Sequence, residues 1–228
     1  MRARHRHFNA QDAGAVLVLD SRYITGLSDG NAVSTWTDRS RSGNNATQAT
    51  AANQPTYQTA EQGGQPLVKF DGSNDIMSTA TPVTTVTNNW ALFSVAKTIS
   101  GSRVHFSNGA NTGYAQTHSG TGGGIGFGGL YGGVAWLNDG AAKTNQWLIQ
   151  STLRISGTAQ FWANGATTGT TFANTPNTPT VATRVGSDGA GFQNCEISTA
   201  VVINVSISQS LRRRIEHAAA FSFKIACS

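Results

Sequence analysis

The chain has 228 residues, a formal net charge of +5, and charged residues at only 12% of its positions, about half of the ~25% found in an average globular domain. Ten Phe and five Trp exclude a disordered chain, because disordered segments combine high net charge with few aromatic residues. The length suits one large β domain with its own core, and no stretch approaches the ~20 apolar residues that span a membrane.

The first half of the chain predicts short strands joined by polar turns. Residues 13–20 and 33–38 are apolar segments that end in polar residues, whereas residues 40–57 have no apolar periodicity and predict a long ordered loop. Residues 66–70 predict another strand, and residues 90–99 predict the strongest one.

The second half contains a clear hairpin signal. An apolar segment at residues 146–155 is followed by a turn at Gly157-Thr158 and by an aromatic strand at residues 160–163, which ends in Asn164-Gly165. Asn-Gly tolerates the positive φ angles that a type I′ turn requires. Further strands are predicted at residues 183–186 and 197–205. Turn signals recur about every 8–12 residues, which predicts an all-β sandwich or barrel.

One helix is predicted, near the C-terminus, with Ser208 or Ser210 as its cap. One face of this helix is predicted to carry residues at helical spacing: Leu211, Ile215, Ala218, Ala219 and Ser222. Arg212, Arg213 and Glu216 are expected on the opposite, polar face.

Several segments follow one another in a characteristic order. They are residues 16–21 (VLVLDS), 30–38 (GNAVSTWTD), 44–48 (NNATQ), 66–72 (PLVKFDG), 161–165 (FWANG), 185–186, 196–197 and 211–225. This order resembles that of LamG-like (concanavalin A-like) jelly-roll domains. The resemblance implies an all-β fold, a two-sheet antiparallel jelly-roll sandwich with one short C-terminal helix, whose concave face often binds carbohydrate. Residues 12–228 are predicted to form this domain.

The first residues form a basic arm, predicted to comprise residues 1–11. Its charged and imidazole side chains are Arg2, Arg4, His5, Arg6 and His7. A basic arm can bind nucleic acid, an anionic glycan or an acidic protein surface. Since no known nucleic-acid motif accompanies the charge, we expect these residues to bind a protein partner or to remain a solvated tail.

The turn after residue 70 carries the chemistry of a calcium site. Asp71, Asn74 and Asp75 place two carboxylates and an amide oxygen in one tight turn, and Ca²⁺ prefers such oxygen ligands. The same residue types also build turns without a metal. Both interpretations stay open, and no other cofactor is predicted.

Carbohydrate binding would use aromatic side chains flanked by amides. Tyr114 and Tyr131 are the preferred aromatic candidates because glycines surround them, and Asn108, Asn111 and Asn164 lie on adjoining turns. Trp136, Trp147 and Trp162 are further aromatic candidates, although an aromatic residue in a β-sandwich more often belongs to the core. The two cysteines, Cys195 and Cys227, could pair or remain free thiols.

Catalysis is not expected from the acidic residues. Glycoside hydrolysis uses two carboxylates, which hydrolases of this fold carry in a Glu-x-Asp-x-x-Glu cluster. The three glutamates, Glu61, Glu196 and Glu216, have no such spacing. The chain is therefore predicted not to be an enzyme, and a glycosidase is the weakest of three hypotheses.

The leading hypothesis is a structural protein of a tailed-phage virion, because the domain is expected to stand alone without a signal peptide. It would be a head decoration or fibre component, made in the host cytoplasm, that binds capsid or other virion proteins and further copies of itself. The alternative is a stand-alone or exported, extracellular lectin-like module that binds cell-surface carbohydrate. Neither hypothesis includes a membrane partner.

Overall fold

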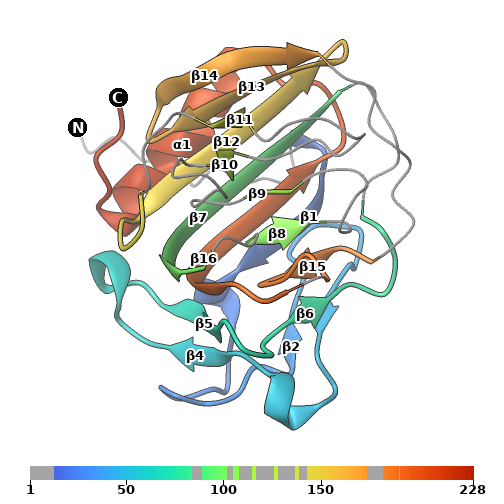
Figure 1. The fold of residues 1–228 in the computed structure, drawn as a ribbon, viewed down its shortest axis with the longest axis vertical. Coiled ribbons are helices and arrows are strands. Elements are labelled where there is room, and N and C mark those ends of the chain that lie inside the picture. The colour runs from blue at the N-terminus through green and yellow to red at the C-terminus, as the bar shows by residue number, and fades with distance from the viewer. Residues whose placement is uncertain are drawn as a thin grey trace, which may run out of the picture.

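The computed structural model is a sandwich of two antiparallel β-sheets with a helix packed against the outside of the larger sheet (Figure 1). It describes residues 13–83, 89–101, 105–107, 115–116, 126–127, 137–138, 143–173, 182–189 and 191–228. The prediction of an all-β sandwich with one C-terminal helix is confirmed for these residues. Among them, no helix is long and apolar enough to cross a membrane.

The larger sheet has eight strands in the order β14-β13-β12-β7-β16-β5-β4, and β1 also pairs with β16. Its strands are β1 (Ala15–Asp20), β4 (Thr56–Gln58), β5 (Leu67–Asp71), β7 (Trp90–Ser100), β12 (Leu148–Ile155), β13 (Thr158–Ala163), β14 (Ala166–Ala173) and β16 (Asn194–Ile203). One edge of β16 is shared, because β5 pairs with its residues 194–197 and β1 with its residues 199–203. The opposite edge pairs with β7 along the whole strand.

The smaller sheet has six strands in the order β2-β3-β6-β15-β8-β9. Each has two residues: β2 (Thr35–Trp36), β3 (Ala46–Thr47), β6 (Met77–Ser78), β15 (Arg184–Val185), β8 (Phe106–Ser107) and β9 (Ala115–Gln116). β10 (Gly126–Phe127) and β11 (Leu137–Asn138) form a separate pair. Single 3₁₀ turns lie at Ser21–Tyr23, Ala51–Asn53 and Gln62–Gly64. The predicted loop at residues 40–57 thus contains β3, one 3₁₀ turn and the start of β4.

The larger sheet is buried on both faces. The main core lies between the two sheets and joins Leu17, Leu19, Phe70, Leu92, Phe161 and Val202 to Trp36, Met77, Phe106 and Val185. On the other face, which we call the helix side, Phe93, Leu153, Trp162, Val201 and Ile203 pack against Ile207 and Ile215. Because apolar groups cover both faces, strands such as β16 are apolar at successive positions.

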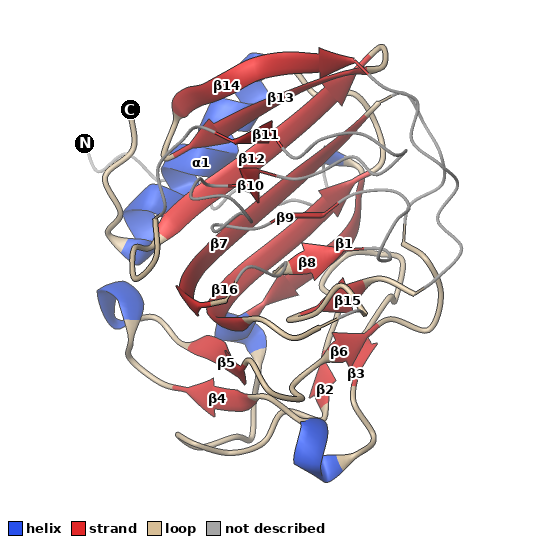
Figure 2. Cartoon of the chain, viewed as in Figure 1, coloured by secondary structure: helices blue, strands red, loops and turns tan. Residues whose placement is uncertain are grey.

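Helix α1 (Gln209–Phe223) crosses the helix side of the larger sheet (Figure 2). Ser208 caps it as predicted, since its hydroxyl accepts a hydrogen bond from the Leu211 N–H at 3.1 Å. Ile215 and Phe223 are buried against the sheet, where each stabilises the fold by roughly 1.5–3 kcal/mol. Arg212 and Glu216 differ from the prediction, because both are buried as a pair rather than exposed on the polar face.

Two tight turns join the last hairpins of the larger sheet. Asn164 and Gly165 have φ angles of 49° and 83°, as the predicted type I′ turn requires. The preceding turn lies at Ser156-Gly157, one residue before the predicted position, with φ angles of 50° and 85°. The cysteines are both free: Cys195 is buried in the main core and Cys227 lies near the C-terminus.

Candidate functional site

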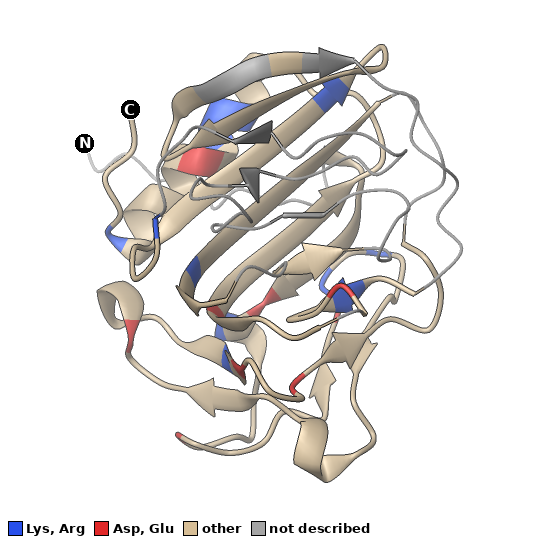
Figure 3. Ribbon diagram, in the orientation of Figure 1, with Lys and Arg blue, Asp and Glu red and all other residues tan. Residues whose placement is uncertain are grey.

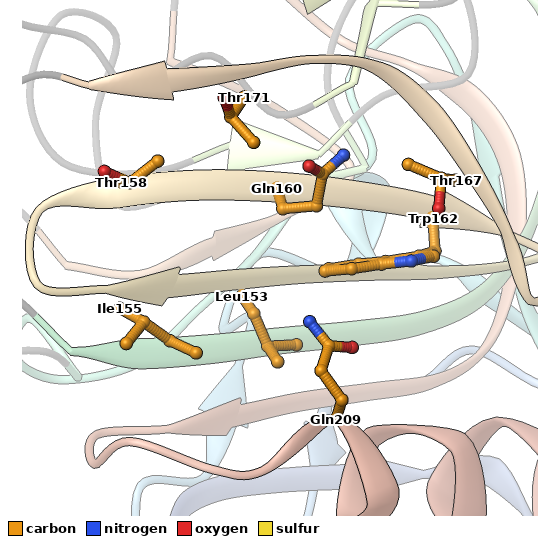
Figure 4. Close-up of a pocket in the computed structure, with 8 residues that line it drawn as sticks. All are labelled: Leu153, Ile155, Thr158, Gln160, Trp162, Thr167, Thr171 and Gln209. Carbon is orange, nitrogen blue, oxygen red and sulfur yellow. The ribbon is translucent and has the colours of Figure 1, made fainter.

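A pocket of about 290 Å³ opens on the helix side of the larger sheet, where β12, β13 and β14 meet the start of α1 (Figure 4). Its lining residues come from these four elements: Leu153, Ile155, Thr158, Gln160, Trp162, Thr167, Thr171 and Gln209. The strand pairing explains the grouping, because Ile155 lies opposite Thr158 and Leu153 opposite Gln160. Alternate side chains of a strand share a face, so Trp162 joins them.

The floor of the pocket is apolar. Leu153 and Trp162 are buried, whereas Ile155 is 40% exposed at the rim. The guanidinium of Arg212 lies over the Trp162 ring, with Cζ 4.2 Å from the ring centroid. A cation over an indole face is attracted by the ring quadrupole, so Arg212 holds the ring in place from the helix.

The wall formed by β14 is shaped by a β-bulge. Ala159 pairs with Phe172 and Phe161 pairs with Thr168, so residues 169–171 of β14 lie opposite the single residue Gln160. A bulge bends its strand and redirects side chains. Here it accompanies two threonines of β14, Thr167 and Thr171, that line the pocket beside Gln160.

A buried network orients Gln209 at the mouth of the pocket. Arg212 Nε donates to Gln209 Oε1 at 2.8 Å, and Arg212 Nη1 donates to both carboxylate oxygens of Glu216, at 2.5 Å to Oε1. Ser151 Oγ donates to the same carboxylate. Arg212 and Glu216 are 2% and 0% exposed, so the two opposite charges offset each other away from water.

The pocket itself is uncharged. None of the described residues that line it carries an ionisable side chain. Figure 3 shows that β13, the central strand of the pocket, carries no charged residue. The site offers an apolar floor, two side-chain amides and three threonine hydroxyls.

Most site residues predicted from the sequence lie outside the described part of the chain. They are Tyr114, Tyr131, Asn108 and Asn111 for carbohydrate, and Arg2, Arg4, His5, Arg6 and His7 for a partner. Their roles stay predictions.

Asn164 is described and serves the β13–β14 turn. Its Oδ1 accepts from the Ile149 N–H at 2.8 Å, and its backbone oxygen accepts from the Ser228 N–H at 2.9 Å. It is not among the residues that line the pocket, although Trp162, two residues earlier in β13, is. A ligand-binding role for Asn164 stays a prediction.

The acidic turn after β5 is closed by backbone hydrogen bonds. Asp71 Oδ1 accepts from the N–H groups of Ser73, Asn74 and Asp75, and Asp75 Oδ2 accepts from the Asp71 N–H at 2.9 Å. Burial opposes ionisation of Asp71, but these N–H donors outweigh it and hold its pKa below the usual value. Among the described residues, no three His, Cys, Asp or Glu side chains gather as a metal site, so calcium at Asp71, Asn74 and Asp75 stays a prediction.

Asp75→Asn should remove one source of pH-dependent stability. Burial raises the pKa of Asp75 to about 6, against about 3.9 in the unfolded chain. The folded chain therefore holds this proton more tightly, so the contribution to stability is fully present below about pH 4 and is lost as the pH rises through about 6. Urea denaturation from pH 4 to pH 8 should show a smaller loss of stability in Asp75→Asn than in the wild type. Asp29→Asn, in an exposed turn, is the control, and identical profiles for wild type and Asp75→Asn would contradict the prediction.

No protein-family model and no curated protein matches the chain. Solved structures do resemble it. A Trypanosoma rangeli sialidase in complex with 2,3-difluorosialic acid has a TM-score of 0.57 and 14% identity, over 95% of this chain and 34% of the sialidase. The binding domain of botulinum neurotoxin serotype D has a TM-score of 0.60 and 13% identity, over 92% of this chain and 52% of that one. The ligand-binding domain of the same serotype in complex with N-acetylneuraminic acid has a TM-score of 0.58 and 14% identity, over 91% and 52%.

These comparisons establish the fold alone. The chain spans about a third of the sialidase and about half of the toxin domain, and the identities are low throughout. A β-rich, lectin-like sandwich is supported, whereas the LamG-like family stays a prediction.

The comparisons contradict the prediction that the chain is not an enzyme. Sialidases are enzymes, and they are among the structures that the chain resembles. The missing Glu-x-Asp-x-x-Glu cluster excludes only one arrangement of catalytic carboxylates. The β-sandwich fold gives no further reason to exclude catalysis, because enzymes also adopt it.

Proposed function

We propose that the chain binds carbohydrate and that the pocket between β12, β13, β14 and α1 is the binding site. The observation that carries this proposal is the chemistry of the lining. Leu153 and Trp162 form an apolar floor, with Ile155 at the rim, beside the amides of Gln160 and Gln209. Sugars combine C–H surfaces with neutral hydroxyls, so they need apolar contact next to uncharged donors and acceptors.

The size of the pocket suits one sugar residue. Its volume of about 290 Å³ lies just below the ~300–1,000 Å³ usual for ligand sites. We expect the end of a glycan chain to enter, while the rest of the chain remains in solvent. The toxin domain solved with N-acetylneuraminic acid supports the proposal, because it is a carbohydrate complex of a similar fold.

Thr171→Val should weaken sugar binding about 2- to 10-fold, since it removes one hydroxyl from the pocket wall and preserves the shape of the side chain. Thr47→Val is the matched control, because Thr47 is also an exposed strand threonine but lies in the smaller sheet. Calorimetric titration of both variants with a panel of methyl glycosides measures the effect. Equal affinities in the two variants, or no binding by the wild type, would contradict the proposal.

A second candidate function is the structural role in a tailed-phage virion, where the chain would bind capsid proteins or other copies of itself. The outward face of α1 favours it, because Phe221 is 74% exposed there. Exposed cationic or imidazole side chains also lie on α1 or at its C-terminal cap: Arg213, Arg214, His217 and Lys224. Light scattering at low and high salt tests this role. A salt-sensitive oligomer supports it, and a monomer under both conditions counts against it.

A further inference from the structure

We propose that the pocket recognises the N-acetyl group of a neutral amino sugar. This inference rests on the proposed function and names the sugar class. It depends on three features of the site: a tryptophan without an open face, a fixed amide donor, and the uncharged lining.

The tryptophan does not offer an open platform for a sugar ring. Trp162 is only 5% exposed, and Arg212 covers one face of its ring at 4.2 Å. A pyranose stacks on an exposed aromatic face, which this arrangement does not provide. The indole and Leu153 instead present a small apolar spot, which fits a methyl group better than a hydroxylated ring.

The amide of Gln209 is fixed as a donor toward this spot. Arg212 Nε can only donate, so the Gln209 oxygen at 2.8 Å must be the acceptor. The side-chain nitrogen then faces the other way, and Figure 4 shows it pointing toward the strands that form the floor. A carbonyl oxygen placed beside the apolar spot would accept a hydrogen bond from this nitrogen.

An acetamido group combines the two features. Its methyl group suits the spot formed by Leu153 and Trp162, and its carbonyl oxygen suits the Gln209 donor. The amide N–H and the ring hydroxyls of the sugar need further partners, which Gln160 and the pocket threonines supply. A hexose with a hydroxyl in place of the acetamido group would leave the apolar spot unfilled.

The uncharged lining selects a neutral sugar over a carboxylated one. A buried carboxylate is costly without a cation, and none of the described lining residues is charged. Arg212, which lies over the Trp162 ring, already donates to Glu216 and Gln209. N-acetylneuraminic acid, which carries an acetamido group and a carboxylate, should therefore bind more weakly than a neutral N-acetylhexosamine.

Calorimetric titration of the full chain tests the inference with four probes: the methyl glycosides of N-acetylglucosamine, N-acetylgalactosamine and glucose, and N-acetylneuraminic acid. At least one N-acetylhexosamine should bind about 10-fold more tightly than glucose. In saturation-transfer NMR, its acetamido methyl should receive the strongest signal from the protein.

Gln209→Glu sharpens the test, because a carboxylate still accepts from Arg212 but cannot donate to the sugar. The variant should lower the ratio of N-acetylhexosamine affinity to glucose affinity about 10-fold, whatever it does to sugar binding in general. Ser210→Glu is the matched control, since it adds the same charge at the next, exposed position of α1.

The outcomes separate the two proposals. Equal binding of glucose and N-acetylhexosamines, or tighter binding of N-acetylneuraminic acid, overturns this inference and leaves carbohydrate binding standing. Gln209→Glu with an unchanged N-acetyl preference also overturns it. Failure of every probe to bind the wild type overturns both.

Discussion

Arg212→Ala is expected to destabilise the fold by about 3–5 kcal/mol, because it leaves the fully buried carboxylate of Glu216 without its cation. The same change removes the side chain that lies over the Trp162 ring and the donor that orients Gln209. Urea denaturation with a circular dichroism readout measures the difference in the free energy of unfolding.

Arg213→Ala provides the control one residue away. Arg213 is exposed, so its loss should change stability by no more than about 0.5 kcal/mol. A double variant, Arg212→Met with Glu216→Leu, should recover most of the lost stability, since it removes both charges together. Equal effects of Arg212→Ala and Arg213→Ala would show that the buried pair does not support the helix.

Gly186→Ala should destabilise the fold by about 2–5 kcal/mol. Gly186 follows β15 with a φ of 80°, which costs a non-glycine residue about 1–2 kcal/mol. An added Cβ would also lie only 2.2 Å from the ring of Phe70, a buried side chain of the main core. Overpacking of this kind typically costs another 1–3 kcal/mol.

Gly30→Ala isolates the contribution of that contact. Gly30 has a similar φ of 77°, but a Cβ there would meet nothing within 4 Å. The difference between the two variants in urea denaturation is therefore the overpacking at Phe70. Equal destabilisation of Gly186→Ala and Gly30→Ala would contradict the close packing of Gly186 on the core.

The sequence predicted correctly those turns and helix ends that depend on one or two adjacent residues. The turn at Asn164-Gly165 depends on two residues that tolerate positive φ, and the start of α1 depends on the hydroxyl of Ser208. Both are confirmed. The two-residue strands of the smaller sheet, such as Thr35–Trp36, are too short to leave an alternating pattern in the sequence.

The candidate site was harder to predict because its parts meet only in the folded chain. Alternation in the β12–β13 hairpin places Leu153, Gln160 and Trp162 on one face, and this signal was available in the sequence. Gln209 reaches that face only because α1 packs across the sheet. Arg212 and Glu216 resemble surface residues of a helix, and only the tertiary contacts with Trp162 and Ser151 explain their burial.

Carbohydrate binding at the pocket is tested most directly by an NMR titration of the isotope-labelled full chain with the methyl glycoside of N-acetylglucosamine. We predict that the indole N–H of Trp162 and the side-chain amides of Gln160 and Gln209 shift together along one saturation curve. The indole of Trp36, buried in the main core, should not move. Shifts confined to other parts of the chain, or no shifts at sugar concentrations well into the millimolar range, would contradict a sugar site at this pocket.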